Sequence, residues 1–287
     1  MDLCSINDIK ALLARHGFHF SKSKGQNFLT QRWVPQRIVA EAGVDGACGV
    51  LEVGPGIGPL TQELCRKANK VVAVEVDTAL QPVLAETMAD AGNLEIIFGD
   101  VLKTDIGALV QEKFPHLKPM ACANLPYYIT TPVLAALLSA RCFDSVTVMV
   151  QKEVAQRICA KASSSEYGAF SVFCQYYAEP KLLFDVPASC FIPQPKVTSA
   201  VLQLRLRSAP PCEILDEDLF FRVVKASFAQ RRKTLLNGLA ASFGALGKQK
   251  LADILTACGI SATARGETLD VAGFACVANA LCRALRA

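Results

Sequence analysis

Short apolar runs alternate with helical patterns through the middle of the chain, and this alternation constrains the fold more than any other feature of the sequence. The apolar runs occupy residues 49–53, 71–76, 94–98, 120–124 and 145–150. Helical patterns lie between them, at 59–68, 78–91 and 131–140. Strands that are apolar on both faces and joined by helices are typical of a parallel sheet covered by helices. Helices at 151–161 and 168–178 and strands at 181–186 and 199–206 are expected to complete it.

The patterning changes after the turn-rich stretch Ser208-Ala209-Pro210-Pro211. Only helical periodicity is found in residues 216–285, where it is broken by Gly244, Gly247, Gly259 and Gly273. A length of 287 residues suits two domains. The sequence therefore predicts an α/β domain over residues 1–207, with a doubly wound parallel sheet, and a small all-helical domain over residues 208–287.

The composition limits the class of protein. A hydrophobic content of 52% with 20% charged residues excludes a disordered or fibrous chain. The 12 cysteines form no CxxC pair and the three histidines do not cluster with them, so we expect free thiols in a reducing compartment and no metal site. The uncharged stretch 119–140 contains Asn124, Pro126 and Pro132, which favours strand, loop and helix over a membrane span. No secretory signal is seen, and a cytoplasmic location is expected.

Positive charge is concentrated in two regions, although the net charge of the chain is only +4. Residues 1–40 hold six lysines and arginines, Lys22 and Lys24 among them, against two acids. Residues 220–237 hold five basic residues and no acid, including Arg231, Arg232 and Lys233. Two such patches suit a polyanion that docks in one orientation. Charge alone is equally compatible with two solvated helix faces.

A glycine-rich segment, LEVGPGIG at residues 51–58, follows the first apolar run. Ligands of doubly wound sheets bind at such strand ends, and glycine lets the backbone turn tightly beside them. The dinucleotide pattern GxGxxG would need glycine where Pro59 stands. The observed spacing is GxGxG with Glu52 two residues before it, which favours a different adenosine-containing ligand. Glu75 closes the next strand, where a carboxylate can accept the ribose hydroxyls. Asp100 follows the third strand and could accept from an adenine amine. Each feature alone also fits a tight turn, an exposed acid or a helix cap.

The tetrapeptide Asn124-Leu125-Pro126-Tyr127 ends the fourth apolar run. The nitrogen of an exocyclic adenine amine is a poor nucleophile because its lone pair is delocalised into the ring. An Asn oxygen and a backbone carbonyl beside a proline can accept its two N–H bonds and favour a pyramidal nitrogen whose lone pair faces a methyl donor. Tyr127 could stack on the base, a contact worth about 1–3 kcal/mol. The alternative is an Asx-Pro turn with a packed tyrosine.

Eight blocks in this order and spacing resemble the ribosomal RNA adenine dimethyltransferases, and most closely those acting on the small-subunit (16S) RNA. The blocks are SKSKGQNFL (21–29), LEVGPGIGPLT (51–61), VVAVEVD (71–77), GDVL (99–102), NLPYYITTPVL (124–134), MVQKEVAQRI (149–158), FIPQPKVTSAVLQL (191–204) and FAQRRKTLLNGL (228–239). The resemblance implies a Rossmann-like class I methyltransferase fold and the cofactor S-adenosyl-L-methionine. It also implies two methyl groups on each of two adjacent adenines in the 3′-terminal stem-loop of 16S RNA, in the small subunit or its precursor.

The resemblance also implies roles for individual residues. The cofactor and reaction site would be lined by Asn27, Leu29, Gly54, Gly56, Glu75, Asp100 and Asn124. Leu125 and Pro126 would complete the reaction site, and Tyr127 and Phe191 would stack on the target base from opposite sides. The RNA would be contacted by Lys22, Lys24, Arg231, Arg232 and Lys233.

Three alternatives compete with this hypothesis. Large-subunit (23S) adenine methyltransferases of the macrolide-resistance type share the glycine loop and an Asn-hydrophobic-Pro-Tyr motif, but Leu125 and the block at 191–204 favour the small-subunit enzyme. A non-catalytic assembly or transcription factor could use the same fold to bind RNA or DNA, although Glu75, Asp100 and Asn124 are intact. A dinucleotide oxidoreductase is disfavoured by Pro59. We expect a monomer, because the helical segment offers no heptad seam.

Overall fold

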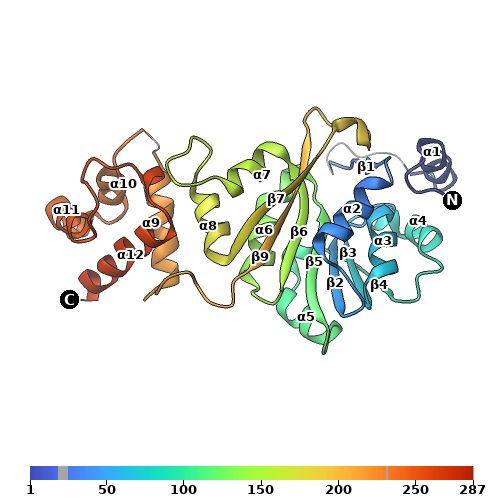
Figure 1. Cartoon of the computed structure of the whole chain (residues 1–287), viewed down its shortest axis with the longest axis horizontal. Coiled ribbons are helices and arrows are strands. Elements are labelled where there is room, and N and C mark those ends of the chain that lie inside the picture. Colours follow the sequence, from blue (N-terminus) through green and yellow to red (C-terminus); the bar gives the residue numbers. More distant parts are fainter. Residues whose placement is uncertain (19–24, 231, 287) are drawn as a thin grey trace. The chain divides into compact units, whose positions relative to one another are not determined.

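The computed structural model describes residues 1–18, 25–230 and 232–286 (Figure 1). The chain forms two compact units. The first comprises Met1–Ala155 with Glu179–Leu206, and the second comprises Gln156–Ala178 with Arg207–Ala287. The division expected from the sequence, at residues 207 and 208, therefore differs from the structural one in the segment 156–178, which joins the C-terminal helices.

The first unit is built on a seven-stranded sheet with the strand order β4-β3-β2-β5-β6-β9-β7. Its strands are β2 (Cys48–Val53), β3 (Lys70–Glu75), β4 (Leu94–Phe98), β5 (Lys118–Asn124), β6 (Ser145–Gln151), β7 (Ala178–Val186) and β9 (Ser199–Leu206). The strands β4, β3, β2, β5 and β6 are parallel, as predicted from their apolar runs. Because β2 lies between β3 and β5, the chain order reverses there, and this is the place where such sheets bind ligands.

One strand at the end of the sheet departs from the parallel arrangement, and its direction was not assigned from the sequence. β9 runs antiparallel to β6, with Ser199 opposite Gln151 and Arg205 opposite Ser145. A parallel connection needs a crossover of a dozen or more residues, usually a helix. The segment between β7 and β9 holds only a 3-10 turn (Ala188–Cys190) and the short β8 (Phe191–Ile192), so it provides no such crossover helix. β8 instead pairs antiparallel with β1 (Phe28–Leu29) in a separate two-stranded sheet.

Helices of the first unit connect the strands and cover the sheet (Figure 1). They are α1 (Ile6–Arg15), α2 (Trp33–Ala42), α3 (Pro59–Lys67), α4 (Gln81–Thr87), α5 (Ile106–Lys113) and α6 (Thr130–Ser139). α3 and α4 lie within the predicted helical patterns, and α6 begins one residue before the pattern predicted at 131–140. α1, α2 and α5 were not predicted, although Ser5 and Asp105 cap α1 and α5 by accepting from backbone N–H groups. Pro59 occupies the first turn of α3, where a missing N–H costs nothing.

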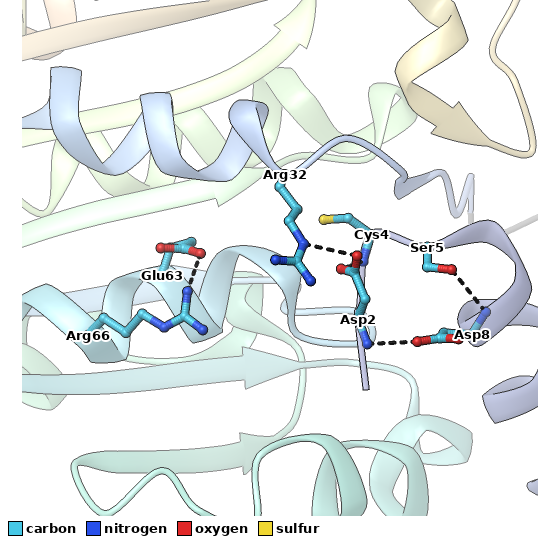
Figure 2. A network of polar contacts seen from close by, with 7 residues as sticks. All are labelled: Asp2, Cys4, Ser5, Asp8, Arg32, Glu63 and Arg66. Atoms are coloured by element: carbon cyan, nitrogen blue, oxygen red, sulfur yellow. Dashed lines mark hydrogen bonds and ion pairs between the residues drawn. The ribbon is translucent and has the colours of Figure 1, made fainter.

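Apolar packing and polar contacts hold the N-terminal segment against the rest of the first unit. Leu12 and Leu13 of α1 share a buried cluster with Ile57 of the glycine loop and Leu80 before α4. Figure 2 shows the polar contacts beside this cluster. Arg32 Nε donates to Asp2 Oδ2 at 2.9 Å, and the Asp2 N–H donates to Asp8 Oδ2 at 2.8 Å. α1 and the loop that precedes α3 therefore share one apolar cluster.

The second unit contains only helices among its long elements, apart from the first residue of β7. They are α8 (Ala169–Tyr177), α9 (Glu217–Phe228), α10 (Leu235–Ser242), α11 (Lys248–Ala257) and α12 (Val271–Arg286), and α7 (Lys152–Cys159) ends in this unit. Glu217 explains why α8 belongs here, since its carboxylate accepts from Tyr176 Oη at 2.9 Å and from Tyr177 Oη at 2.6 Å. Gly273 lies inside α12 and does not end a helix, contrary to the prediction.

The uncharged stretch 119–140 forms β5, a 3-10 turn (Tyr127–Ile129) and α6, as the sequence indicated. None of the helices in the described parts of the chain has the length and apolar composition that a membrane crossing requires.

Candidate active site

A cavity opens at the carboxyl ends of β2, β3 and β5, where the strand order reverses. It is lined by ten residues that the sequence predicted for the site: Asn27, Leu29, Gly54, Gly56, Glu75, Asn124, Leu125, Pro126, Tyr127 and Phe191. They come from five separate stretches of the chain. The fold therefore brings into one cavity the segment around β1, the glycine loop, the acid that ends β3, the Asn-Leu-Pro-Tyr segment and the aromatic of β8.

The glycine loop adopts a conformation that favours glycine. Gly54, Gly56 and Gly58 all have positive φ, at 72°, 63° and 95°. At Gly56 a Cβ would also meet the ring of Phe28 at 3.2 Å. Residues with a Cβ rarely adopt this backbone region, so glycine here reflects both conformation and space.

Glu75 fixes the loop from the next strand. Its Oε2 accepts from the N–H of Gly56 at 3.2 Å, and its Oε1 accepts from the N–H of Asp77 at 2.8 Å. Burial raises the pKa of Glu75, and these two backbone donors oppose that rise. Asp77 Oδ2 in turn accepts from Gln26 Nε2 at 2.8 Å. One polar chain thus connects the glycine loop, the end of β3 and the segment before β1.

Glu52 was noted in the sequence as part of the glycine motif but was given no role in the site. It lines the cavity at the end of β2 and is only 1% exposed. Its Oε2 finds no hydrogen-bond partner among the described residues. Burial raises the pKa of Glu52 to about 8, and the nearby charge of Glu75 adds to the rise. A ligand that donates to this carboxyl would satisfy an otherwise unpaired buried group.

Replacing Glu52 with glutamine is expected to remove a pH dependence of stability. The unfolded chain loses this proton above pH 4.5 and the folded chain only above about pH 8, so ionisation favours the unfolded state between these values. The penalty grows with pH to roughly 5 kcal/mol and levels off once the pH is well above 8. Thermal unfolding of the ligand-free protein from pH 5 to pH 8 should show a smaller loss of melting temperature in Glu52→Gln than in the parent.

The matched control for this titration is Glu41→Gln, at an exposed position of α2. This variant should follow the parent across the pH range. Parallel curves for Glu52→Gln and the parent would show that the Glu52 carboxyl does not retain its proton in the folded chain.

Asn124 ends β5 with its side chain at the cavity. Its Nδ2 donates to the carbonyl of Asn27 in a long hydrogen bond of 3.4 Å, and no described residue donates to its Oδ1. Next to it, the N–H of Leu125 donates to the carbonyl of Met149 in β6 at 3.1 Å. The carbonyl of Pro126 accepts from the N–H of Ile129 and from Thr130 Oγ1. The segment is therefore held by its neighbours while the Asn124 oxygen stays available to a donor in the cavity.

Two aromatic residues reach the cavity from different elements. Tyr127 begins the 3-10 turn after Pro126 and its hydroxyl lies 2.7 Å from Ser199 Oγ. Phe191 lies on β8, opposite Leu29 of β1, and is 5% exposed. The short β1–β8 sheet thus explains how GQNFL and FIPQP, far apart in sequence, contribute to one site.

The remaining predicted residues lie elsewhere. Asp100 is not among the residues that line the cavity, and its Oδ1 accepts from the N–H of Leu102. Arg232 and Lys233 are exposed in the connection between α9 and α10 of the second unit. Lys22, Lys24 and Arg231 fall outside the described residues, so their predicted RNA contacts stay predictions.

Sequence reasoning missed several lining residues besides Glu52, among them Gln26, Asp77 and Tyr128. Each is adjacent to, or two residues from, a position that was predicted. The sequence did not show which way the side chains point at the strand ends, because the pairing of the backbones sets that direction.

Comparison with known proteins shows the family to which the chain belongs. Residues 17–276 match the family model described as ribosomal RNA adenine dimethylase. The proteins named ribosomal RNA small subunit methyltransferase A from Geobacillus thermodenitrificans and Shouchella clausii are 48% and 47% identical to this chain. These alignments cover 98% and 99% of this chain and 97% of each relative.

Solved structures give the same result for the fold. A dimethyladenosine transferase from Plasmodium falciparum superposes with a TM-score of 0.74 at 24% identity, covering 89% of this chain and 98% of that one. The 23S rRNA methyltransferase ErmE has a TM-score of 0.67 at 25% identity, with 89% and 99% covered. The Rossmann-like prediction is confirmed. The much higher identity to proteins named for the small subunit favours the main hypothesis over the large-subunit one. The chain belongs to the ribosomal RNA adenine dimethylase family, and it is a methyltransferase that uses S-adenosylmethionine.

Proposed function

We propose that this enzyme transfers two methyl groups to N6 of each of two adjacent adenines in the 3′-terminal stem-loop of 16S ribosomal RNA. The observation that carries the proposal is the Asn124 side chain, which lines the cavity with an Oδ1 that accepts from no described residue. Methylation of an adenine amine needs such an acceptor at the carboxyl end of the sheet.

The cavity fits S-adenosylmethionine, which when bound supplies an electrophilic methyl group on a sulfonium sulfur. The loop at Gly54–Gly58 has the positive φ angles that let backbone approach a ligand. Glu75 closes the strand beside it, where a carboxylate can accept ribose hydroxyls. The unpaired Oε2 of Glu52 supplies a buried acceptor that suits the ammonium group of the cofactor's amino-acid part.

The target amine would be held by the Asn124 segment. Asn124 Oδ1 and the carbonyl of Leu125, beside Pro126, would accept its two N–H bonds and draw the lone pair out of the ring. Holding donor and acceptor together makes the step effectively unimolecular. The nitrogen becomes acidic only after it gains the methyl group, so its proton can pass to water and no strong base is required.

The aromatic pair would hold the plane of the base. We assign stacking on the adenine to Tyr127 and Phe191, at about 1–3 kcal/mol for each such contact. A stem-loop presents an unpaired or easily flipped base at low cost. Arg232 and Lys233, which are exposed in the helical unit, would contact phosphates, with Lys22, Lys24 and Arg231 assigned to the same role from the sequence alone. We also propose that Asp100 accepts from the cofactor's adenine amine.

The finer features of the proposal concern the partner and the cell. We infer that the substrate is the 16S RNA within the small subunit or its precursor, that the enzyme acts as a monomer, and that it works in the cytoplasm. Free thiols at all 12 cysteines agree with a reducing compartment.

The test is incubation of the enzyme with S-adenosylmethionine labelled on its methyl group and three separate substrates: under-methylated small subunits, large-subunit RNA and naked 16S RNA. Of the three substrates, we expect label only in the RNA of the under-methylated small subunits, as dimethyladenosine at two neighbouring positions. Label in the large-subunit RNA would favour the 23S alternative. No label in any substrate would favour a binding factor and overturn the proposal.

A further inference from the structure

The hydroxyl of Tyr127 forms a hydrogen bond with a residue far away in the sequence. Tyr127 Oη lies 2.7 Å from Ser199 Oγ, a distance typical of an O–H···O hydrogen bond. Ser199 is fully buried, whereas Tyr127 is only partly buried and lines the cavity. The contact therefore connects a cavity side chain to the interior of the sheet.

Ser199 is a rigid anchor. It is the first residue of β9 and pairs with Gln151 of β6 across the antiparallel ladder. The adjacent Thr198 accepts from the N–H of Lys152, the residue after Gln151, at 3.0 Å, which continues the same pairing by one residue. A group on a paired strand moves little, because strand pairing fixes its backbone.

The tyrosine ring is thereby fixed at both ends. Its backbone follows Pro126 in the 3-10 turn, and its hydroxyl is held by Ser199. Two side-chain torsions separate these ends, so a hydrogen bond at the far end leaves little freedom for the plane of the ring. Burial raises the pKa of Tyr127 from its usual value near 10, so the hydroxyl keeps its proton at neutral pH and can donate. Phenylalanine would fill the same apolar space without this restraint.

We propose that Ser199 is a positioning residue, which orients the Tyr127 ring for the target adenine through the bond between the two hydroxyls. This inference rests on the proposed function, in which Tyr127 stacks on the base. It assigns a role to a residue that touches neither cofactor nor base, and it explains why the cavity carries tyrosine at this position.

The experiment compares two isosteres at position 199. Ser199→Val removes the hydroxyl and Ser199→Thr retains it, so the added bulk is the same in both. With small subunits as substrate, Ser199→Val should lower kcat/KM for RNA about three- to tenfold relative to Ser199→Thr, the effect of one hydrogen bond. Affinity for S-adenosylhomocysteine should be equal in the two variants, because the glycine loop and Glu75 are unchanged.

Tyr127→Phe gives a second route to the same answer at a partly exposed site. It should lower kcat/KM by the same factor, and Tyr127→Phe combined with Ser199→Val should lower it no further, since both changes remove one bond. The matched control is Thr147→Val on the neighbouring β6. It removes a fully buried hydroxyl that has no partner among the described residues, and it should leave activity at the parent level.

Several results would overturn the inference. Equal activity of Ser199→Val and Ser199→Thr would do so, as would multiplicative losses in the combined variant. A parallel fall of melting temperature, cofactor affinity and kcat/KM in Ser199→Val alone would indicate general damage to the sheet. Tyr127→Ala separates this inference from the proposed function. If Tyr127→Ala is inactive while Tyr127→Phe is fully active, only the role of Ser199 is lost, whereas full activity of Tyr127→Ala removes the stacking role itself.

Discussion

Asn124→Ala is expected to lower the rate of methyl transfer on the order of 10²- to 10³-fold, the loss seen when one preorganised polar contact to a reacting group is removed. The reason is that Asn124 lines the cavity and its Oδ1 accepts no hydrogen bond from the described chain. Alanine leaves the amine without its acceptor, so the lone pair stays delocalised in the ring. RNA affinity should change little, because phosphate contacts dominate binding to RNA. Single-turnover methylation and filter binding of small subunits measure the two quantities separately.

The control for this prediction is Asn69→Ala, which removes an exposed asparagine whose Nδ2 donates to the carbonyl of Gly46. It should methylate at the parent rate. Normal turnover by Asn124→Ala would refute the role of the side chain, and a large loss of RNA affinity would move that role from the reaction to binding.

Glu75→Gln is expected to weaken binding of S-adenosylhomocysteine on the order of 10²-fold, with turnover lost in proportion at limiting cofactor. The two carboxylate oxygens accept from the N–H groups of Gly56 and Asp77. Glutamine offers one acceptor and one donor, so one of these N–H groups would face another N–H. Hydrogen bonds to a charged group contribute about 1.5–3 kcal/mol, and the ribose contact proposed for the same carboxylate is weakened as well. Isothermal titration calorimetry gives the affinity directly.

A suitable comparison is Glu86→Gln. Glu86 is on α4 and contacts Arg15 and His16 from an exposed position. Surface ion pairs contribute about 0–1 kcal/mol, so this change should leave cofactor affinity within a fewfold of the parent. An affinity in Glu75→Gln equal to that in Glu86→Gln would show that the carboxylate after β3 does not hold the ligand.

The sheet could be predicted because its strands are buried on both faces. All six residues of β2 are buried, and such runs are visible in a sequence as unbroken apolar segments. The direction of β9 was not assigned from the sequence, because the apolar run at 199–206 looks the same in either direction. The signal that decides it is the lack of a helical pattern between 187 and 198, which removes the crossover that a parallel strand needs.

The helical unit shows a different limit of sequence reasoning. The segment 168–178 was predicted to be a helix, and α8 is one. Its place with the C-terminal helices depends on Tyr176 and Tyr177 reaching the carboxylate of Glu217, some 40 residues away. Periodicity along the chain carries no information on such long-range pairing.

The candidate site was predictable where a residue's position relative to a strand decides its location. Asn124 and Glu75 end the two parallel strands on either side of β2, so they were expected to lie at the same edge of the sheet, and both line the cavity. Glu52 lies two residues before Gly54 and its neighbour Val53 is also buried, so the sequence alone does not reveal that its carboxyl reaches the cavity. The contact of Gln26 with Asp77 likewise depends on where residues 25–27 lie over the sheet.

The conformation of the glycine loop depends on more than the residues that would touch a ligand, because α1 shares a buried cluster with this loop. Leu12 and Leu13 are in one cluster with Ile57, between Gly56 and Gly58. Trimming or redesigning the start of this chain would therefore change the apolar packing that supports the glycine loop, even if every cavity residue were left intact.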